Sequence, residues 1–315
     1  MAQINKAKIV ICEFMAKDSV HLLQQHFNIC YEPNLNEDSA TLKQRLVNAD
    51  ALIVRNKTQV NAHLLQAAEK LKVIGRLGVG LDNIDLHYCR ENNIKVIPAT
   101  GANARAVAEY VIAATLLLMR GCFMQSALVA SGQWPRLQMS SGHEVFGKTM
   151  GLVGFGGIGR LVAHLAAGLG MQVIAFDSKI AADDPVWKKL NVQFVHFEEL
   201  VQSSDAISLH VPLTRETKNL FNAQVIRLMR PTAVLINTAR GGIVDEQALM
   251  DALNAQKIAG AALDVFSQEP LPDTVDFKKA SNLILTPHIA GVSTESNIRV
   301  SDFIAKAVRD FLICL

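Results

Sequence analysis

The sequence has few cysteines and no concentration of positive charge, and each absence narrows the possible functions. Its five cysteines are odd in number, scattered over 315 residues and never in a C-x-x-C pair. A disulfide framework or a zinc site is therefore not expected, no metal is expected, and a reducing cytoplasm is the expected compartment. Lys and Arg (31) nearly balance Asp and Glu (29), for a net charge of +2, and no basic run occurs. Nucleic acid and anionic membrane are therefore not expected as partners.

Long apolar runs are also missing. The longest, residues 110–119, is bounded by Glu109 and Arg120 and is about half of the ~20 residues that span a bilayer. It predicts a buried helix. The first residues enter a strand pattern directly, without the basic start and apolar core of a secretory signal. No membrane association is expected.

Short apolar runs alternate with amphipathic stretches along the whole chain, which is long enough for two domains. This alternation predicts an α/β fold with parallel, doubly wound sheets. The strands are expected at residues 8–12, 29–31, 51–54, 73–74, 95–97, 149–153, 172–176, 192–195, 206–209, 233–236, 259–263 and 283–285. The clearest helices are expected at residues 19–27, 41–47, 62–68, 104–120, 158–169 and 294–312. Residues 104–120 are apolar on more than one face, so we expect this helix between the domains or in a subunit interface.

A glycine-spaced turn organises the second half of the chain. Gly154, Gly156 and Gly159 follow a buried strand and open a helix in the pattern G-x-G-x-x-G. The first glycine permits a tight turn, the second lets the backbone approach a pyrophosphate, and the third lets helix and strand pack closely. Asp177 ends the next strand about 20 residues on, where a carboxylate accepts the ribose hydroxyls. A carboxylate there repels the extra phosphate of NADP, so NAD is the expected cofactor, although Lys179 is close by.

Polar residues follow the later strands, where parallel sheets bind ligands. They are His210, Thr238 with Arg240, Asp264 with Glu269, and Thr286 with His288. In the first half, Arg55 follows one strand, and Arg76 precedes the glycine loop Gly78-Val79-Gly80. This loop is either an anion-binding nest or a tight turn that needs glycine.

Three segments, N-T-A-R-G-G-I-V-D-E with Arg240, D-V-F-S-Q-E-P with Glu269 and T-P-H-I-A-G with His288, resemble the signatures of the D-isomer-specific 2-hydroxyacid dehydrogenases. The resemblance extends over essentially the whole chain and is closest to the D-3-phosphoglycerate dehydrogenase branch. It implies NAD-linked interconversion of a 2-hydroxy acid and a 2-oxo acid. The implied subunit has a Rossmann-type cofactor domain, a flavodoxin-like substrate domain and a cleft between them. A homodimer through the cofactor domains is also implied.

The residue types suit this chemistry. Hydride transfer at C2 requires a proton on the C2 oxygen, which a histidine at position 288 can exchange. Glu269 would hold the imidazole in one tautomer and raise its pKa. Arg240 would bind the substrate carboxylate or carbonyl oxygen.

Further residues are assigned by position or by the resemblance. His210 is expected to line the cofactor site without proton chemistry, and Asp264 resembles the family's contact on the nicotinamide side. The complete expected cofactor set is Gly154, Gly156, Gly157, Ile158, Gly159, Asp177, His210, Val211, Pro212, Thr217, Thr238, Ala239, Asp264 and Gly291. The expected substrate set is Arg55, Arg76, Gly78, Val79, Gly80, Asn103 and Arg136, the last from a neighbouring subunit.

The expected domains are residues 1–101 with 292–315 for the substrate, and residues 102–291 for NAD. Several arginines beyond Arg240 suggest a second anionic group on the substrate, either the phosphate of 3-phosphoglycerate or the sulfonate of sulfolactate. Alternatively, the arginines pair with Asp82 or Asp85, and the protein is a broad glyoxylate or hydroxypyruvate reductase. A third possibility is an NAD-responsive regulatory protein. The chain stops at Leu315, so the serine feedback of longer relatives is not expected.

Overall fold

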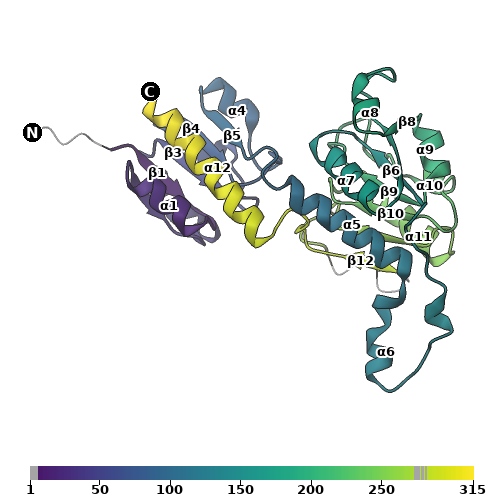
Figure 1. Cartoon of the computed structure of the whole chain (residues 1–315). Coiled ribbons are helices and arrows are strands. Elements are labelled where there is room, and N and C mark those ends of the chain that lie inside the picture. The colour runs from purple at the N-terminus through teal and green to yellow at the C-terminus, as the bar shows by residue number, and fades with distance from the viewer. Residues whose placement is uncertain (1–5, 273–276, 278–279, 281) are drawn as a thin grey trace, which may run out of the picture. The chain divides into compact units, whose positions relative to one another are not determined.

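The computed structural model describes residues 6–272, 277, 280 and 282–315. They form two compact units, each with its own sheet (Figure 1). The first unit comprises the described residues up to Asn103 together with Val292–Leu315, and the second is Ala104–Gly291.

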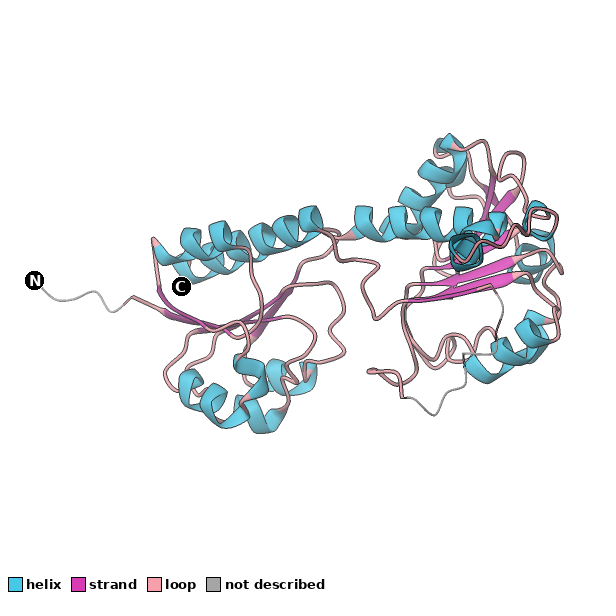
Figure 2. Cartoon of the chain, turned by 90° about the horizontal axis from the view of Figure 1, so that it is seen from below, coloured by secondary structure: helices cyan, strands magenta, loops and turns pink. Residues whose placement is uncertain are grey.

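The first unit contains a five-stranded, all-parallel sheet in the order β2-β1-β3-β4-β5. Its strands are β1 (Lys8–Ile11), β2 (Asn28–Tyr31), β3 (Ala51–Val54), β4 (Val73–Arg76) and β5 (Lys95–Pro98). The helices are α1 (Lys17–Gln24), η1 (Leu35–Glu37), α2 (Ser39–Leu46), α3 (Ala62–Leu65), α4 (Leu86–Glu91) and α12 (Thr294–Ile313). Figure 2 shows helices on both faces of this sheet, as a doubly wound fold requires.

The last helix completes one face of this sheet. Ile304 and Val308 of α12 are fully buried with Ile9 and Ile53 of the central strands. A Cβ at Gly75 would stand 2.7 Å from Ile304 Cγ2. Glycine at this position therefore lets α12 close on β4.

The second unit contains a seven-stranded, all-parallel sheet in the order β12-β11-β10-β9-β6-β7-β8. Its strands are β6 (Thr149–Val153), β7 (Gln172–Phe176), β8 (Gln193–Phe194), β9 (Ala206–Leu209), β10 (Val234–Asn237), β11 (Gly260–Leu263) and β12 (Leu283–Leu285). The helices are α5 (Ala104–Arg120), η2 (Cys122–Gln125), α6 (Ser126–Ala130), η3 (Gln138–Ser140), α7 (Gly157–Gly168), α8 (Pro185–Lys189), α9 (Phe197–Ser203), α10 (Ala223–Ile226) and α11 (Glu246–Asn254).

Helix α5 belongs to the core of the second unit. Its buried residues Ala108, Val111, Ala114 and Leu118 share a cluster with residues of α7 and of the central strands. Burial against its own sheet therefore accounts for the apolar content of this helix, for which the sequence pattern alone predicts a domain or subunit interface.

The predicted fold class, two parallel-sheet α/β units, is confirmed. The strands at residues 51–54, 149–153, 172–176, 206–209 and 283–285 and the helix at residues 104–120 have the predicted bounds. The other bounds shift by one to three residues, and α1 and α3 each end three residues earlier than predicted.

Candidate active site

The polar residues predicted at strand ends lie on one edge of the second unit's sheet, because all seven strands run parallel. The glycine turn follows β6, which lies between β7 and β9. After β6 the chain adds β7 and β8 on one side of this strand, and it then adds β9 to β12 on the other side. Doubly wound sheets bind ligands at the point where the strand order reverses in this way.

The geometry of the turn fits a pyrophosphate. Gly154 has a φ of +96°, and a Cβ there would stand 2.6 Å from the carbonyl oxygen of His210. At Gly159 a Cβ would stand 2.4 Å from the Gly154 oxygen. At Gly156 and Gly157 no described atom lies within 4 Å of that position. The turn is thus packed against neighbouring backbone at Gly154 and Gly159, and it is open at Gly156 and Gly157, where α7 begins. The first N–H groups of α7 are therefore accessible to a phosphate.

Asp177 joins the turn to the end of β7. Its Oδ2 accepts the N–H of Phe155 at 2.8 Å, and its Oδ1 accepts the N–H of Lys179 at 2.9 Å. Each carboxylate oxygen has two lone-pair positions, so the carboxylate retains capacity for a ribose diol.

Two buried polar atoms directly after β9 and β10 have no hydrogen-bond partner in the described part of the chain: Nε2 of His210 and Oγ1 of Thr238. Natural proteins satisfy nearly all such atoms. Together with the open glycine turn, they fit the polar groups of a bound dinucleotide. Burial lowers the pKa of His210 to about 4, so the imidazole is neutral near pH 7.

His210 should make the protein less stable in acid. As the pH falls below about 6.5, the unfolded chain binds a proton at this histidine and the folded protein does not, until the pH reaches about 4. The free energy of unfolding should decline over this window, with His210 contributing at most about 1.4 kcal/mol per pH unit. Urea titrations between about pH 7 and pH 4 should show a shallower decline for His210→Gln. His164→Gln, at an exposed histidine of α7, should behave as wild type, and an unchanged slope in His210→Gln would contradict the assignment.

His288 and Glu269 form a hydrogen-bonded pair. Nδ1 of His288 lies 2.7 Å from Oε2 of Glu269, and the side chains are 40% and 35% exposed. An ionised carboxylate only accepts, so Nδ1 carries a proton and donates it. The Nε2 position then remains for proton exchange with a ligand. The other carboxylate oxygen, Oε1, accepts the N–H of Phe266 at 3.0 Å, which fixes Glu269 in its loop.

The loop that carries His288 is held by Asp264, which is 1% exposed. Asp264 Oδ1 accepts the Thr286 hydroxyl at 2.6 Å and the N–H of Ile289 at 2.8 Å, and Oδ2 accepts the N–H of Ala290 at 2.8 Å. His288 has a φ of +57°, a left-handed conformation that non-glycine residues adopt only where surrounding contacts enforce it. Asp264, expected as a cofactor contact, thus has a structural role in this loop.

The Arg240 loop lies against the Glu269 loop. Asn237, 1% exposed, donates from Nδ2 to the Arg240 carbonyl and accepts the N–H of Ala239. A Cβ at Gly241 would stand 1.8 Å from the Phe266 oxygen, so only glycine permits this approach. The structure thereby brings together the loops of Arg240, Glu269 and His288. Sequence reasoning missed Asn237, although it stands in the quoted Arg240 segment.

The remaining cofactor candidates lie on the same edge. Val211 and Pro212 follow His210, and Ile158 is in the first turn of α7. The Thr217 hydroxyl donates to the Pro212 carbonyl at 2.6 Å, so it closes the loop after β9. Gly291 is the last residue of the second unit.

In the first unit, Arg55 follows β3, next to β1, where strand addition also reverses. Its Nη2 donates to Asn297 Oδ1 at 2.8 Å, and its guanidinium lies over the ring of Phe14 at 5.7 Å. Burial lowers the pKa of Arg55, and the charge of Glu13 opposes this effect. Glu13, 4% exposed, accepts the N–H groups of Arg55, Lys57 and Thr58. No sequence pattern points to Glu13, Phe14 or Asn297.

Arg76 lies over the glycine loop. Its Nη1 donates to the Leu77 carbonyl at 3.0 Å, and a Cβ at Gly78 would stand 1.7 Å from that nitrogen. Neither Gly78 nor Gly80 has a positive φ, so the loop lacks the alternating handedness of a nest. The glycine at 78 leaves room for the guanidinium. Val79 is 38% exposed, and Asp85 caps α4 by accepting the N–H of Tyr88.

The two remaining substrate candidates are Asn103 and Arg136. Asn103 is the last residue before the second unit, and its Oδ1 is buried with no partner among the described residues. Arg136 is exposed in the arm formed by residues 121–146, which Figure 1 shows leaving the body of the second unit at α6.

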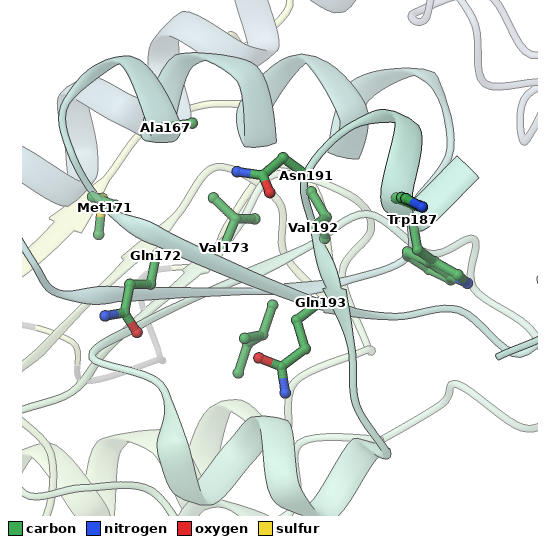
Figure 3. A pocket seen from close by; sticks show the side chains of 10 residues that line it. Ala167, Met171, Gln172, Val173, Trp187, Asn191, Val192 and Gln193 are labelled. Atoms are coloured by element: carbon green, nitrogen blue, oxygen red, sulfur yellow. The ribbon is translucent and has the colours of Figure 1, made fainter. Parts of the chain in front are cut away.

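A separate hollow of about 480 Å³ lies at the amino ends of β7 and β8 (Figure 3). Gln172 and Gln193 begin these strands, whereas the glycine turn and Asp177 lie at the opposite, carboxyl edge. This cavity is therefore not the dinucleotide site.

Among residues 6–272, 277, 280 and 282–315, no helix is both long and apolar enough to cross a membrane. The same residues include no cluster of three or more His, Cys, Asp or Glu side chains suited to a metal ion.

The glycine turn at a switch point and the strand-end groups beside it define a dinucleotide-binding oxidoreductase of the Rossmann class. Residues 112–290 match the family model described as D-isomer specific 2-hydroxyacid dehydrogenase, NAD binding domain. The chain belongs to this family of NAD-dependent dehydrogenases.

Individual relatives cover the chain almost completely. It is 46% identical to an (S)-sulfolactate dehydrogenase of Chromohalobacter salexigens, over 93% of this chain and 94% of that protein. It is 37% identical to a D-3-phosphoglycerate dehydrogenase of Synechocystis over 98% of this chain, but spans only 55% of that protein. The crystal structure of the TT0316 protein from Thermus thermophilus aligns with a TM-score of 0.88 at 30% identity, covering 98% of this chain and 97% of that one.

Proposed function

We propose that this protein interconverts a D-2-hydroxy acid and a 2-oxo acid that carries a second anionic group. The observation that supports the reaction is the 2.7 Å hydrogen bond between His288 and Glu269 on the edge that carries the glycine turn. NAD, when bound, supplies hydride exchange with C2 of the substrate.

In this proposal His288 moves the proton. With Nδ1–H donated to Glu269, the imidazole holds or accepts a proton at Nε2, where the C2 oxygen of the substrate exchanges it. The Glu269 carboxylate keeps the ring in this tautomer and stabilises the imidazolium form. Arg240 binds the carboxylate or carbonyl oxygen common to all 2-oxo acids and stabilises charge that develops on it.

The second anionic group is inferred from Arg55 and Arg76. Arg55 is fixed by Asn297 and Phe14 at the reversal point of the first sheet, and Arg76 ends the next strand. Gly78, Val79, Gly80 and Asn103 complete the proposed substrate set. A substrate with one carboxylate needs only Arg240, so the additional guanidinium groups favour a doubly anionic substrate.

A sulfonate is the favoured second group, and a phosphate is the alternative. The sulfolactate dehydrogenase is 46% identical over 93% of this chain, whereas the phosphoglycerate dehydrogenase is 37% identical over 98% of it. The test is NADH oxidation with 3-sulfopyruvate, 3-phosphohydroxypyruvate, glyoxylate and hydroxypyruvate. Equal kcat/KM for all four would favour a broad-specificity reductase. No turnover with any of them would favour an NAD-responsive regulatory protein.

The kcat/KM with NAD should be much higher than with NADP, and Asp177→Ala should lower the ratio of these two values by on the order of tenfold or more. The carboxylate accepts the ribose hydroxyls through charge-assisted bonds of ~1.5–3 kcal/mol each and repels a 2′-phosphate. Steady-state kcat/KM with both cofactors measures the ratio. Asp177→Asn retains one acceptor for the Phe155 N–H and separates loss of charge from loss of the turn contact. Asp183→Ala, at a neighbouring exposed carboxylate, serves as control. Equal use of both cofactors by the unmodified protein would refute the assignment.

A homodimer formed through the arm is part of the proposal. Trp134, Leu137 and Phe146 are 80%, 88% and 77% exposed, and a second copy of the chain would cover them. Arg136 lies among these residues, which supports its role in a neighbouring subunit's substrate site. The five cysteines suit a reducing compartment, and we propose the cytoplasm.

A further inference from the structure

The loop that carries His288 begins at Thr286, whose side chain contacts a residue outside the proposed catalytic set. Tyr110 lies in α5, and its hydroxyl oxygen is 2.6 Å from the hydroxyl oxygen of Thr286. Thr286 directly follows β12 and donates its single hydroxyl proton to Asp264 Oδ1. Because that proton is engaged, the Tyr110 hydroxyl is the donor in the contact between the two hydroxyls.

The result is a directed chain of hydrogen bonds, from Tyr110 to Thr286 to Asp264. Successive bonds of this kind polarise and strengthen one another in a poorly hydrated interior. The acceptor at the end, Asp264, is 1% exposed, so it relies on protein donors in place of water. Burial raises the pKa of Tyr110, the hydrogen bond with Thr286 opposes this effect, and the charge of Asp264 adds to it. The net rise keeps this hydroxyl protonated.

Asp264 fixes the loop on both sides of His288. On the preceding side it holds the Thr286 hydroxyl, and on the following side it accepts the N–H groups of Ile289 and Ala290. Its own carbonyl accepts the His288 N–H at 2.8 Å. His288 itself has the left-handed φ of +57°. The carboxylate therefore maintains a backbone conformation that a histidine adopts at a cost.

We propose that Tyr110 and Thr286 are positioning residues, whose hydroxyls orient Asp264 and thereby aim the His288 imidazole at Glu269. Neither hydroxyl moves the substrate proton. This inference rests on the proposed function only where it concerns turnover, because the local stability of the loop can be measured without substrate.

Tyr110→Phe should raise hydrogen exchange in the peptide covering residues 286–291 by about fivefold to tenfold, the effect of losing one partly buried hydrogen bond. In the same variant kcat should fall by about fivefold or more, since small displacements of a catalytic group are costly. The Kd of NADH, measured by fluorescence, should change by less than about twofold. Thr286→Val should have larger effects, and Thr286→Ser, which keeps the hydroxyl, should restore near-wild-type values.

Thr115→Val is the matched control. Thr115 is also in α5, is 1% exposed and donates its hydroxyl only along its own helix, to the Val111 carbonyl at 2.8 Å. Thr115→Val should leave hydrogen exchange at residues 286–291 unchanged.

The proposal is overturned if hydrogen exchange at residues 286–291 in Tyr110→Phe is as slow as in Thr115→Val. It is also overturned if this exchange becomes faster in Tyr110→Phe while kcat remains at the wild-type value. If Tyr110→Phe does not fold, the same comparison of hydrogen exchange and kcat is made between Thr286→Val and Thr286→Ser. A wild-type protein inactive on every 2-oxo acid would refute the proposed function, and the exchange data would still decide whether the two hydroxyls fix the loop.

Discussion

Replacing His288 with alanine will lower kcat by at least about a hundredfold to ten-thousandfold and leave NADH binding nearly intact. The large loss follows because the imidazole exchanges the proton of the C2 oxygen, and general acid–base groups contribute factors of this size. NADH binding is retained because the glycine turn and Asp177 belong to other loops. Stopped-flow or steady-state NADH oxidation measures kcat, and fluorescence titration measures the Kd of NADH.

The control for this variant is His87→Ala. His87 is an exposed histidine of α4 that pairs with Glu91 at 3.2 Å, so its loss should not affect turnover. A kcat of His288→Ala within about threefold of wild type would remove the residue from the mechanism. Loss of NADH binding in the same variant would instead assign His288 to the cofactor site.

Arg76→Ala and Arg240→Ala should separate the two anionic groups of the substrate. Arg76→Ala should lower kcat/KM for a doubly anionic substrate and leave glyoxylate reduction nearly unchanged. Charge-assisted hydrogen bonds are worth roughly 1.5–3 kcal/mol each, so losing two of them costs on the order of a hundredfold or more. Arg240→Ala should impair both substrates, because its target is common to them. The measurement is kcat/KM of each variant with glyoxylate, 3-sulfopyruvate and 3-phosphohydroxypyruvate.

General misfolding cannot imitate this selective pattern, since it would lower every rate together. Arg90→Ala, at an exposed arginine of α4, controls for the loss of a positive charge from the first unit. An equal loss on glyoxylate and on the doubly anionic substrates in Arg76→Ala would make the arginine structural. A broad-specificity 2-oxo acid reductase would then be the better description.

The strands of the two sheets were predictable because most of them are short, mainly apolar runs bounded by polar residues. Residues 51–54 and 206–209 are buried throughout, so their apolar pattern leaves little choice of structure. The sequence pattern does not identify the short helices α8 and α10, because about one turn of helix is too short to display an amphipathic period. Their signals are the caps Asp184 and Asn222.

The candidate site was predictable only where its residues share a local motif. The segments of Arg240, Glu269 and His288 each follow a strand, and parallel strands end at one edge. The contact between Tyr110 and Thr286 joins residues 176 positions apart, and that between Arg55 and Asn297 joins residues 242 apart. Sequence spacing contains no information on such pairs until the helices are packed on their sheets. The role of Gly78 was also out of reach, because it depends on the direction of the Arg76 side chain.

The packing of α12 on β4 has a consequence for the order of events during synthesis. On the ribosome, strands β1 to β5 emerge before residues 104–291, yet one face of their sheet is completed by Val300, Ile304 and Val308, which emerge only after those residues. The intervening residues 104–291 form a complete unit with its own core and can fold while the first sheet still exposes Ile9 and Ile53. The nascent chain therefore presents an uncovered apolar surface for the whole time needed to translate the inserted unit. In this interval it is a target for chaperone binding.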